Sequence, residues 1–183
     1  MAWTVPMTFA DGTALTAAQM NTYLRDNLNE TMTAKATTAG GLFFSTDVNE
    51  WAERIPAYMR RNTTFSTTSA TYVNAADLGP RVTVTTGTDA LVLFAAHITN
   101  SSANSATYCS YNVSGASSIA SAEAQSIRMD GLLAGTGDNS LGAAMFDIRN
   151  DLTPGENTFQ LTYRVDAGTG SFAYRVLAVV PLA

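Results

Sequence analysis

Residues 90–100 read ALVLFAAHITN, and their apolar side chains fall on both faces of an extended strand. A strand of this kind belongs in the middle of a β-sandwich or at a contact between subunits. Short apolar runs bounded by Gly, Ser, Asn and Pro clusters precede and follow it, and such clusters signal turns. The run therefore predicts the central strand of an antiparallel β domain.

The clearest neighbouring strand follows the turn at Pro154-Gly155. Its large apolar residues alternate strictly with polar ones, as in a half-buried antiparallel strand: Phe159, Leu161, Tyr163 and Val165. Residues 166–171 (DAGTGS) then predict a hairpin that joins it to a last strand at residues 172–180.

The last strand is apolar on both faces over its C-terminal half. Phe172 and every second residue up to Val180 share one face, whereas Leu177 and Val179 lie on the other. Because a strand that is apolar on both faces needs cover on both, we expect Leu177 and Val179 to contact a second subunit.

Four further runs carry strand patterns, at residues 81–85, 107–113, 126–133 and 141–149. The total is about eight strands, spaced by turn signals as in β-sandwiches, and eight is the number that a jelly roll requires. The sequence thus predicts a mainly β protein in which residues 63–183 form an antiparallel jelly-roll β-sandwich.

Residues 13–30, TALTAAQMNTYLRDNLNE, predict an amphipathic α-helix. Thr16 is a favourable N-cap, Gln19 completes a capping box, and Leu15 can pack on Met20. One face carries an apolar stripe at three- and four-residue spacing, formed by Ala17, Met20, Leu24 and Leu28 with Tyr23 alongside. An isolated helix of this length is marginal in water, so the stripe needs a partner surface.

Two interpretations of this partner surface remain: the stripe packs on the chain's own β domain, or it docks on another protein. We favour the second. The extended lead-in to the helix also carries large apolar residues, which need burial on the β domain or in a neighbour's surface. The predicted partner-docking residues are Trp3, Phe9, Leu15, Met20, Tyr23, Leu24 and Leu28.

A short hairpin is expected between the helix and the β domain. Residues 42–45 and 51–55 are apolar-bearing runs separated by the turn-prone Asp47-Val48-Asn49. Because a two-stranded hairpin is not stable alone, its aromatic residues need cover from three copies around an axis or from the β domain. The aromatic residues assigned to subunit contact are Phe43, Phe44 and Trp51. The predicted division is an arm and helix at 1–40, a hairpin neck and connector at 41–62, and the sandwich at 63–183.

Composition argues against several classes of function. Cys109 is the only cysteine, so an intrachain disulfide is impossible and a reducing site of synthesis fits. The net charge is −5 and the ten basic residues are scattered, so no nucleic-acid partner is expected. No run reaches the roughly 18 apolar residues of a membrane helix, and the opening lacks a signal-peptide pattern, so neither membrane insertion nor export by that route is expected.

The titratable residues suggest no catalytic, cofactor-binding or metal-binding set, and no enzymatic activity is expected. His97 is the only histidine and is predicted to be a core or interface residue. Cys109 lies in a strand pattern without a basic neighbour, which predicts a buried, inert thiol. Arg164 and Arg175 are expected on the polar face of the last two strands, pairing with carboxylates or contacting a subunit. Loop capping, in preference to a hydrolytic pair or a calcium loop, is expected for Asp130, Asp138, Asp147, Asp151 and Asp166.

Two stretches resemble virion proteins of tailed phages. The opening is similar to the N-terminal segment shared by many structural proteins of these phages, particularly those of actinobacteria. The similarity lies in Trp3, Pro6, residues 9–12 (FADG), residues 15–21 (LTAAQMN) and residues 24–28 (LRDNL).

The second stretch, residues 41–55, resembles a β element of phage fibres in which Gly-Asp-Leu-x-Tyr is followed by Asn and then Arg-Leu. Here Gly41 stands in place of Asp, and Phe44 in place of Tyr. The strand and turn pattern of the remaining chain resembles fibre heads of the jelly-roll type.

The resemblance implies a virion protein, assembled in the host cytoplasm, with an N-terminal anchor, a short neck and a distal β domain that is commonly trimeric in such fibres. Its partners would be other virion proteins, of the tail or the capsid, and further copies of itself in a homotrimer. A minor tail or fibre protein is the first interpretation, and a capsid decoration (head fibre) protein is the second. A host-glycan-binding module is a further alternative, with stacking platforms among Tyr72, Tyr108, Tyr111 and Tyr174.

Overall fold

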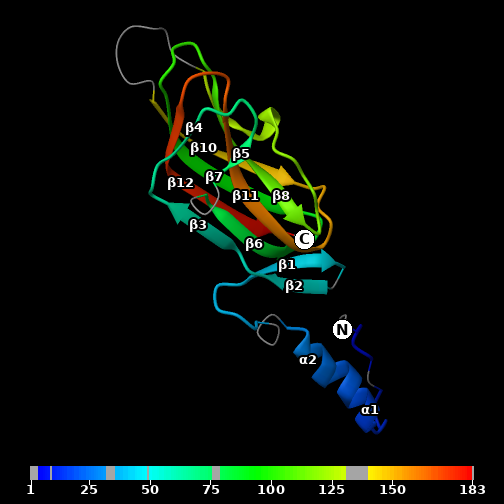
Figure 1. The fold of residues 1–183 in the computed structure, drawn as a ribbon. Coiled ribbons are helices and arrows are strands. Elements are labelled where there is room, and N and C mark those ends of the chain that lie inside the picture. The colour runs from blue at the N-terminus through cyan, green and yellow to red at the C-terminus, as the bar shows by residue number, and fades with distance from the viewer. Residues whose placement is uncertain are drawn as a thin grey trace. The chain divides into compact units, whose positions relative to one another are not determined.

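The computed structural model describes residues 4–8, 10–31, 36–48, 50–75, 79–130 and 140–182 of the chain. The chain divides between Ile55 and Pro56 into two units (Figure 1). Within the described ranges, no helix is long and apolar enough to cross a membrane. Several residues named above lie outside these ranges: Trp3, Phe9, Asn49 and Asp138.

The first unit contains the predicted helix, which is built from three consecutive segments. They are α1 (Ala17–Met20), a π-helical segment (Asn21–Asp26) and α2 (Asn27–Asn29). The capping box is confirmed: the Gln19 N–H donates to Thr16 Oγ1 at 3.2 Å, and the Thr16 N–H donates to Gln19 Oε1 at 2.9 Å. The π-helical turn was not predicted, because its wider hydrogen-bond spacing leaves no mark in a short apolar pattern.

The predicted hairpin also lies in the first unit. β1 (Leu42–Asp47) and β2 (Glu50–Arg54) pair antiparallel, with Phe44 opposite Ala52 and Ser45 opposite Trp51. Directly opposite residues share a face of the sheet, and neighbours along a strand point to opposite faces. Phe43 and Trp51 therefore lie on one face of the hairpin, and Phe44 lies on the other.

Two facing antiparallel sheets form the second unit (Figure 1). The β7 sheet has the order β10 (Ser140–Arg149), β7 (Ala90–Asn100) and β12 (Gly170–Pro181), with β3 (Ala57–Arg61) and β4 (Phe65–Thr67) in succession along the free edge of β12. The β8 sheet has the order β9 (Ile127–Met129), β8 (Thr107–Gly115) and β11 (Gly155–Val165), with β5 (Val73–Asn74) and β6 (Arg81–Thr86) along the edge of β11. A short 3₁₀-helix, Glu123–Gln125, precedes β9.

This arrangement confirms the predicted jelly-roll sandwich. β3 and β4 share one position, as do β5 and β6, so the ten strands described in this unit occupy eight positions. β7 matches its prediction residue for residue, and β6, β8 and β10 lie within two residues of theirs. β9 covers part of the strand predicted at 126–133, of which residues 131–133 lie outside the described ranges.

The sandwich begins at Pro56 and not at residue 63. Residues 57–61, predicted to be a connector, form β3 and pair with the Arg175–Val179 stretch of β12. Ala57 and Met59 pack against the core from this strand. With only five residues and two of them arginines, β3 carries too little alternation to be recognised from sequence.

The predicted hairpin between the last two strands is wrong. β11 belongs to the β8 sheet and β12 to the β7 sheet, so residues 166–169 carry the chain from one sheet to the other. Alternation determines which side chains of a strand are buried, but not the strand with which it pairs. The turn sequence DAGTGS is compatible with both paths.

A bulge in β12 reverses the expected faces of its C-terminal half. The register with β7 shifts between Ala173 and Val176, where Tyr174 has a φ of +50°. Beyond the shift, Leu177 and Val179 are fully buried between the sheets, so the prediction that they contact a second subunit is wrong. The outer face carries Val176, Ala178 and Val180 instead.

The core between the sheets is aromatic at its centre. Tyr111 from β8 lies 5.6 Å from Phe94 of β7 and 6.2 Å from Phe159 of β11, measured between ring centroids. Tyr163 and Phe172 form a second pair at 4.6 Å. Burying a side chain of this size contributes about 1.5–3 kcal/mol to stability. The predicted inward face of β11 is confirmed, because its four alternating apolar side chains are completely buried.

Candidate functional site

The helix exposes the large residues of the apolar stripe that the sequence predicted, with exposed fractions of 48% for Met20, 46% for Leu24 and 66% for Leu28. Leu15, which lies before the N-cap Thr16, is 41% exposed. Tyr23 is half-buried. These side chains are available to a partner, and their assignment to docking remains a prediction, as it does for Trp3 and Phe9 outside the described ranges.

Asn27 ties the N-terminal arm to the helix. Its side chain is buried, and its Oδ1 accepts from the Thr4 N–H at 2.9 Å while its Nδ2 donates to the Thr4 carbonyl at 2.9 Å. Nδ2 also lies 3.1 Å from the Tyr23 carbonyl of the preceding helical turn. The Asn27 side chain thus bonds both the N–H and the carbonyl of Thr4, as a neighbouring strand would. These two hydrogen bonds hold the arm against the helix. The sequence contained no signal for this contact beyond the presence of Asn27 in the phage-like motif.

Glu53 secures the entry into the hairpin. Its carboxylate accepts from the Thr37 hydroxyl and N–H and, at 3.1 Å, from the Thr38 N–H. These hydrogen bonds, that from the Thr37 side chain first, lower the pKa of Glu53. Gly41 lies directly beside the Glu53 side chain, which would have to shift if this position carried a Cβ.

The aromatic residues of the hairpin are partly covered. Phe43 and Phe44 are half-buried, and Trp51 is 43% exposed. Because the two phenylalanines lie on opposite faces, a single flat partner surface contacts only one of them. Their role in subunit contact stays a prediction.

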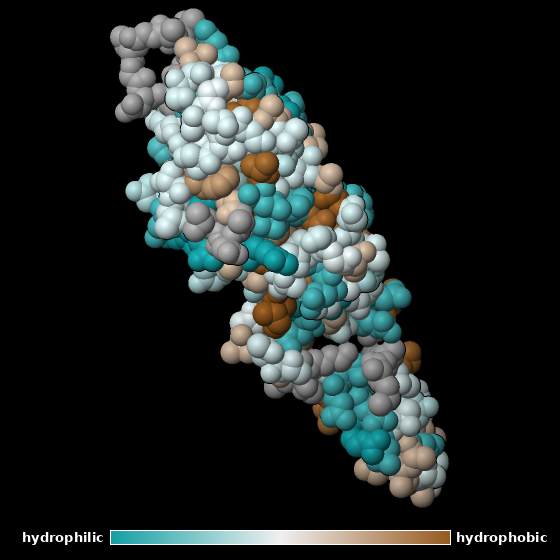
Figure 2. Space-filling view, in the orientation of Figure 1, coloured by the Kyte–Doolittle hydropathy of each residue, from teal (hydrophilic) through white to brown (hydrophobic). Residues whose placement is uncertain are grey.

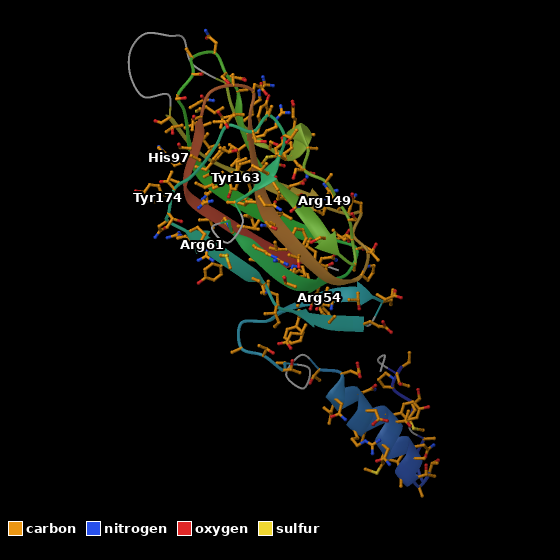
Figure 3. The ribbon with its side chains drawn as sticks, viewed as in Figure 1. Arg54, Arg61, His97, Arg149, Tyr163 and Tyr174 are labelled. Atoms are coloured by element: carbon orange, nitrogen blue, oxygen red, sulfur yellow. The ribbon has the colours of Figure 1, made fainter. Side chains whose placement is uncertain are left out.

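His97 lines a hollow on the outer face of the β7 sheet, and Tyr174 contacts His97. Tyr174 is 66% exposed, and its ring lies edge-on to that of His97 with centroids 6.4 Å apart. Figure 3 shows the two side chains on the same side of the domain. The open hollow that His97 lines has a volume of about 380 Å³, and its other lining residues each bear a hydroxyl or amide group: Thr99, Asn100, Ser101, Ser140, Thr169 and Ser171. An aromatic ring next to such a lining can hold a small polar ligand.

The backbone at Tyr174 is strained. A positive φ places the Cβ of a residue other than glycine too close to the following carbonyl, which costs roughly 1–2 kcal/mol. Strained residues of this kind concentrate at functional positions. The bulge that holds Tyr174 outward also turns the next residue, Arg175, completely into the core.

The other tyrosines proposed as platforms are less accessible. Tyr108 and Tyr111 are buried, with 2% and 0% exposed, so the structure removes them from the set. Tyr111 donates to Asp147, and burial, followed by this contact, raises its pKa above the ordinary value. Tyr72 is half-buried, and its hydroxyl lies 2.8 Å from Ser126 Oγ.

Three of the aspartates expected to cap loops form ion pairs with nearby arginines. Asp130 contacts Arg128, Asp151 contacts Arg149, and Asp166 contacts Arg164 at 3.2 Å. Arg164 also contacts Glu123 at 2.5 Å, which agrees with the predicted pairing of Arg164 with carboxylates. The prediction that Arg175 lies on the polar face of its strand is wrong, because Arg175 is completely buried. Over the described part of the chain, no three His, Cys, Asp or Glu side chains gather as a metal site.

Cys109 and His97 occupy different environments. Cys109 is buried as predicted, and burial raises the pKa of its thiol to about 12, so the reactive thiolate is disfavoured. His97 is half-buried on the outer face of β7, beside Tyr174, and not in the core.

No protein-family model matches the sequence, and no curated protein matches it. Among solved structures, the chain is similar to the Eiger TNF of S. frugiperda, with 13% identity, 71% of this chain and 93% of that chain covered, and a TM-score of 0.45. The VP2 subviral particle protein of infectious bursal disease virus is matched at 13% identity and a TM-score of 0.45, over 76% of this chain and 36% of that one. The CBM22-1 xylan-binding domain of Paenibacillus barcinonensis Xyn10C is matched at 8% identity and a TM-score of 0.33, over 80% of this chain and 99% of that one. The fold assignment rests on the chain's own strand order.

Proposed function

We propose that this protein is a non-enzymatic structural component of a tailed-phage virion, docked through its N-terminal arm and helix and displaying the β-sandwich outward as a minor tail or fibre protein. The observation that carries the proposal is the exposed stripe of Met20, Leu24 and Leu28, with Leu15 before the N-cap, on a helix that is otherwise well specified by its cap. Its location is the virion, after assembly in the host cytoplasm.

The energetics of the helix support docking. Complete burial of a Leu or Met side chain contributes about 1.5–3 kcal/mol, so covering four half-exposed ones contributes on the order of 3–6 kcal/mol. A helix of this length is marginal by itself, and it gains this free energy only on a surface that excludes water. Asn27 holds the arm against the helix, so both can enter one site on the partner.

The resemblance of residues 3–28 to the N-terminal segment of phage structural proteins supports a virion partner. A capsid decoration or head-fibre protein is the alternative placement, because the same stripe serves for either particle surface. Separating tails from heads of disrupted particles and locating the protein distinguishes the two.

Leu24→Asp is expected to abolish incorporation into particles, because a charge in the middle of the stripe cannot be buried without large cost. Particles are produced from a phage genome that encodes the variant, and the protein is quantified in purified particles by immunoblotting. Asn21→Asp, which adds the same charge at an exposed polar position of the helix, is the matched control and should be incorporated normally.

Incorporation of the Leu24→Asp variant at the normal level would overturn docking through the stripe. Absence of the unaltered protein from purified particles would overturn the assignment to a virion. The melting temperature of the sandwich should be the same in both variants.

A host-glycan-binding module is a second candidate, favoured by Tyr174. An exposed aromatic ring held at positive φ beside a hydroxyl-lined hollow can stack on a sugar ring while the hollow binds its hydroxyl groups. The unaltered protein is expected to bind a bacterial surface polysaccharide on an array, and Tyr174→Ala to weaken this binding at least tenfold.

Tyr58→Ala is the control for this experiment. Tyr58 is 79% exposed on the same sheet, where it lies opposite Ala178, whereas Tyr174 contacts His97, a residue that lines the hollow. Equal binding by the Tyr174→Ala variant, or no binding of any polysaccharide by the unaltered protein, would eliminate the glycan candidate.

A further inference from the structure

The outer faces of the two sheets differ sharply in chemistry. On the β8 sheet, the outward residues of β6, β8 and β11 are polar or charged and include Arg81, Thr83, Asn112, Ser114, Thr158 and Gln160. The side of the domain shown in Figure 2 is likewise mostly pale or teal, with brown residues in isolated spots. The β7 sheet carries aliphatic and aromatic residues outward over half of its length.

Strand register brings these apolar residues together. Tyr58 of β3, Ala178 of β12, Leu93 of β7 and Phe146 of β10 are successive cross-strand partners and so share one face in a single row. The adjacent row contains Val180, Leu91 and Ile148. We call these rows the apolar outer face. The polar hollow beside His97 lies farther along the same strands.

The exposed apolar area of this face matches the largest patch found on a typical monomer. Tyr58 is 79% exposed, Phe146 69% and Ile148 61%. An aromatic side chain has about 150–250 Å² to bury, so Tyr58 and Phe146 together leave on the order of 220–370 Å² uncovered. With Ile148 and Leu93, the uncovered area falls within the roughly 300–600 Å² of such a patch, which is often a functional surface.

Next to Phe146, between this face and the neighbouring row of Val176, Ala95 and Ala144, is a hollow. Small residues, Ala95, Ala144 and Ala178, form its floor together with Val176, and its volume is about 220 Å³. An apolar cavity of about 150 Å³ holds a benzene ring, so this hollow can hold the ring of a phenylalanine. Phe146 borders it from the same face.

We propose that this apolar outer face joins copies of the chain, with Phe146 of one copy seated in the Ala95–Ala144–Ala178 hollow of the next. One face that carries both a protruding ring and a fitting hollow is complementary to itself, which is the condition for association of identical subunits. The two rows contain no charged side chain. The next row, which carries Val176, Ala95 and Ala144 of the hollow, ends at the exposed Arg60 of β3.

Association also covers outward side chains of β10, the outermost strand of the described β7 sheet. β10 is ten residues long, and Ala144, Phe146 and Ile148 are exposed on this face. This proposal concerns residues 56–182 and does not depend on attachment to a virion.

Sedimentation velocity of the full chain tests the proposal. At micromolar concentration the unaltered protein is expected to sediment as an oligomer, and Phe146→Asp to shift it to monomer, with the association constant at least 100-fold lower. Thr85→Asp, which adds the same charge at an exposed position on the outer face of the β8 sheet, is the control and should leave the oligomer unchanged. Melting of each variant by circular dichroism confirms that it is folded.

Ala144→Trp provides a second test, because it fills the hollow and leaves Phe146 in place. It is expected to dissociate the oligomer as well. A monomeric unaltered protein, or an oligomer that survives both substitutions, would overturn the proposal. The oligomer could also persist in both variants but dissociate when residues 1–55 are deleted. That result would place the contact in the N-terminal unit and would overturn the proposal.

Discussion

Arg175→Ala is expected to lower the free energy of unfolding by about 3 kcal/mol or more, because it removes a large, fully buried side chain and leaves a cavity. The guanidinium carbon lies 5.9 Å from the ring centroid of Phe65 and 5.5 Å from that of Tyr163. Nη2 donates to the Thr63 carbonyl at 2.9 Å, which ties the β3–β4 connection to β12. Among the described residues, the ion pairs do not include Arg175.

Arg175→Met is the informative comparison, since it keeps most of the volume but not the charge. Replacement of a buried charge by an apolar group of similar size is often neutral, because the desolvation penalty disappears with the charge. We expect Arg175→Met to lose less than half as much stability as Arg175→Ala. Urea unfolding followed by circular dichroism measures both. Equal losses would show that the guanidinium hydrogen bonds to the Thr63 carbonyl and the Tyr163 hydroxyl, and not core volume, set the role of Arg175.

Two truncations are expected to behave very differently, although their start sites are close. A chain that begins at Pro56 should fold and retain the melting transition of the sandwich, because it contains the whole second unit. A chain that begins at residue 63 should melt at a much lower temperature or aggregate, because it lacks β3.

The loss follows from what β3 contributes. The truncation at residue 63 removes a paired strand from the edge of β12. It also removes the packing of Ala57 and Met59 on the core. Burial of Met59 and net contributions of about 0.5–1.5 kcal/mol from each strand hydrogen bond add to several kcal/mol. Thermal melting and gel filtration of the two chains check this, and equal melting temperatures would contradict it. Neither truncated chain is expected to join particles, since both lack the docking helix.

Strong local patterns were predicted well from sequence. β7, β8, β10 and β11 have nine or more residues each, long enough for alternation or continuous apolarity to stand out. The helix cap was equally clear because Thr16 and Gln19 interact over three residues. β3, β4 and β5 have five residues or fewer, and their burial depends on neighbours far away in the chain.

The candidate sites also differ in whether a local sequence pattern could predict them. The exposed helix stripe could be read from its spacing, whereas the clamp between Asn27 and Thr4 joins residues 23 positions apart and has no local pattern. The tyrosine set was reduced to its accessible members only when the sheets were assembled. The apolar outer face arises from rows across β3, β12, β7 and β10, and no single strand reveals it.

By itself, the sequence determined that the protein is a β-sandwich preceded by a capped amphipathic helix, because both depend on periodicity within one segment. Only the tertiary structure decided that β11 and β12 lie in different sheets and that a bulge at Tyr174 buries Leu177 and Val179 while turning Val176, Ala178 and Val180 outward. The physical reason is that a strand's pattern of apolar residues specifies its buried face, whereas its pairing partners and a one-residue shift in register are set by packing between distant parts of the chain.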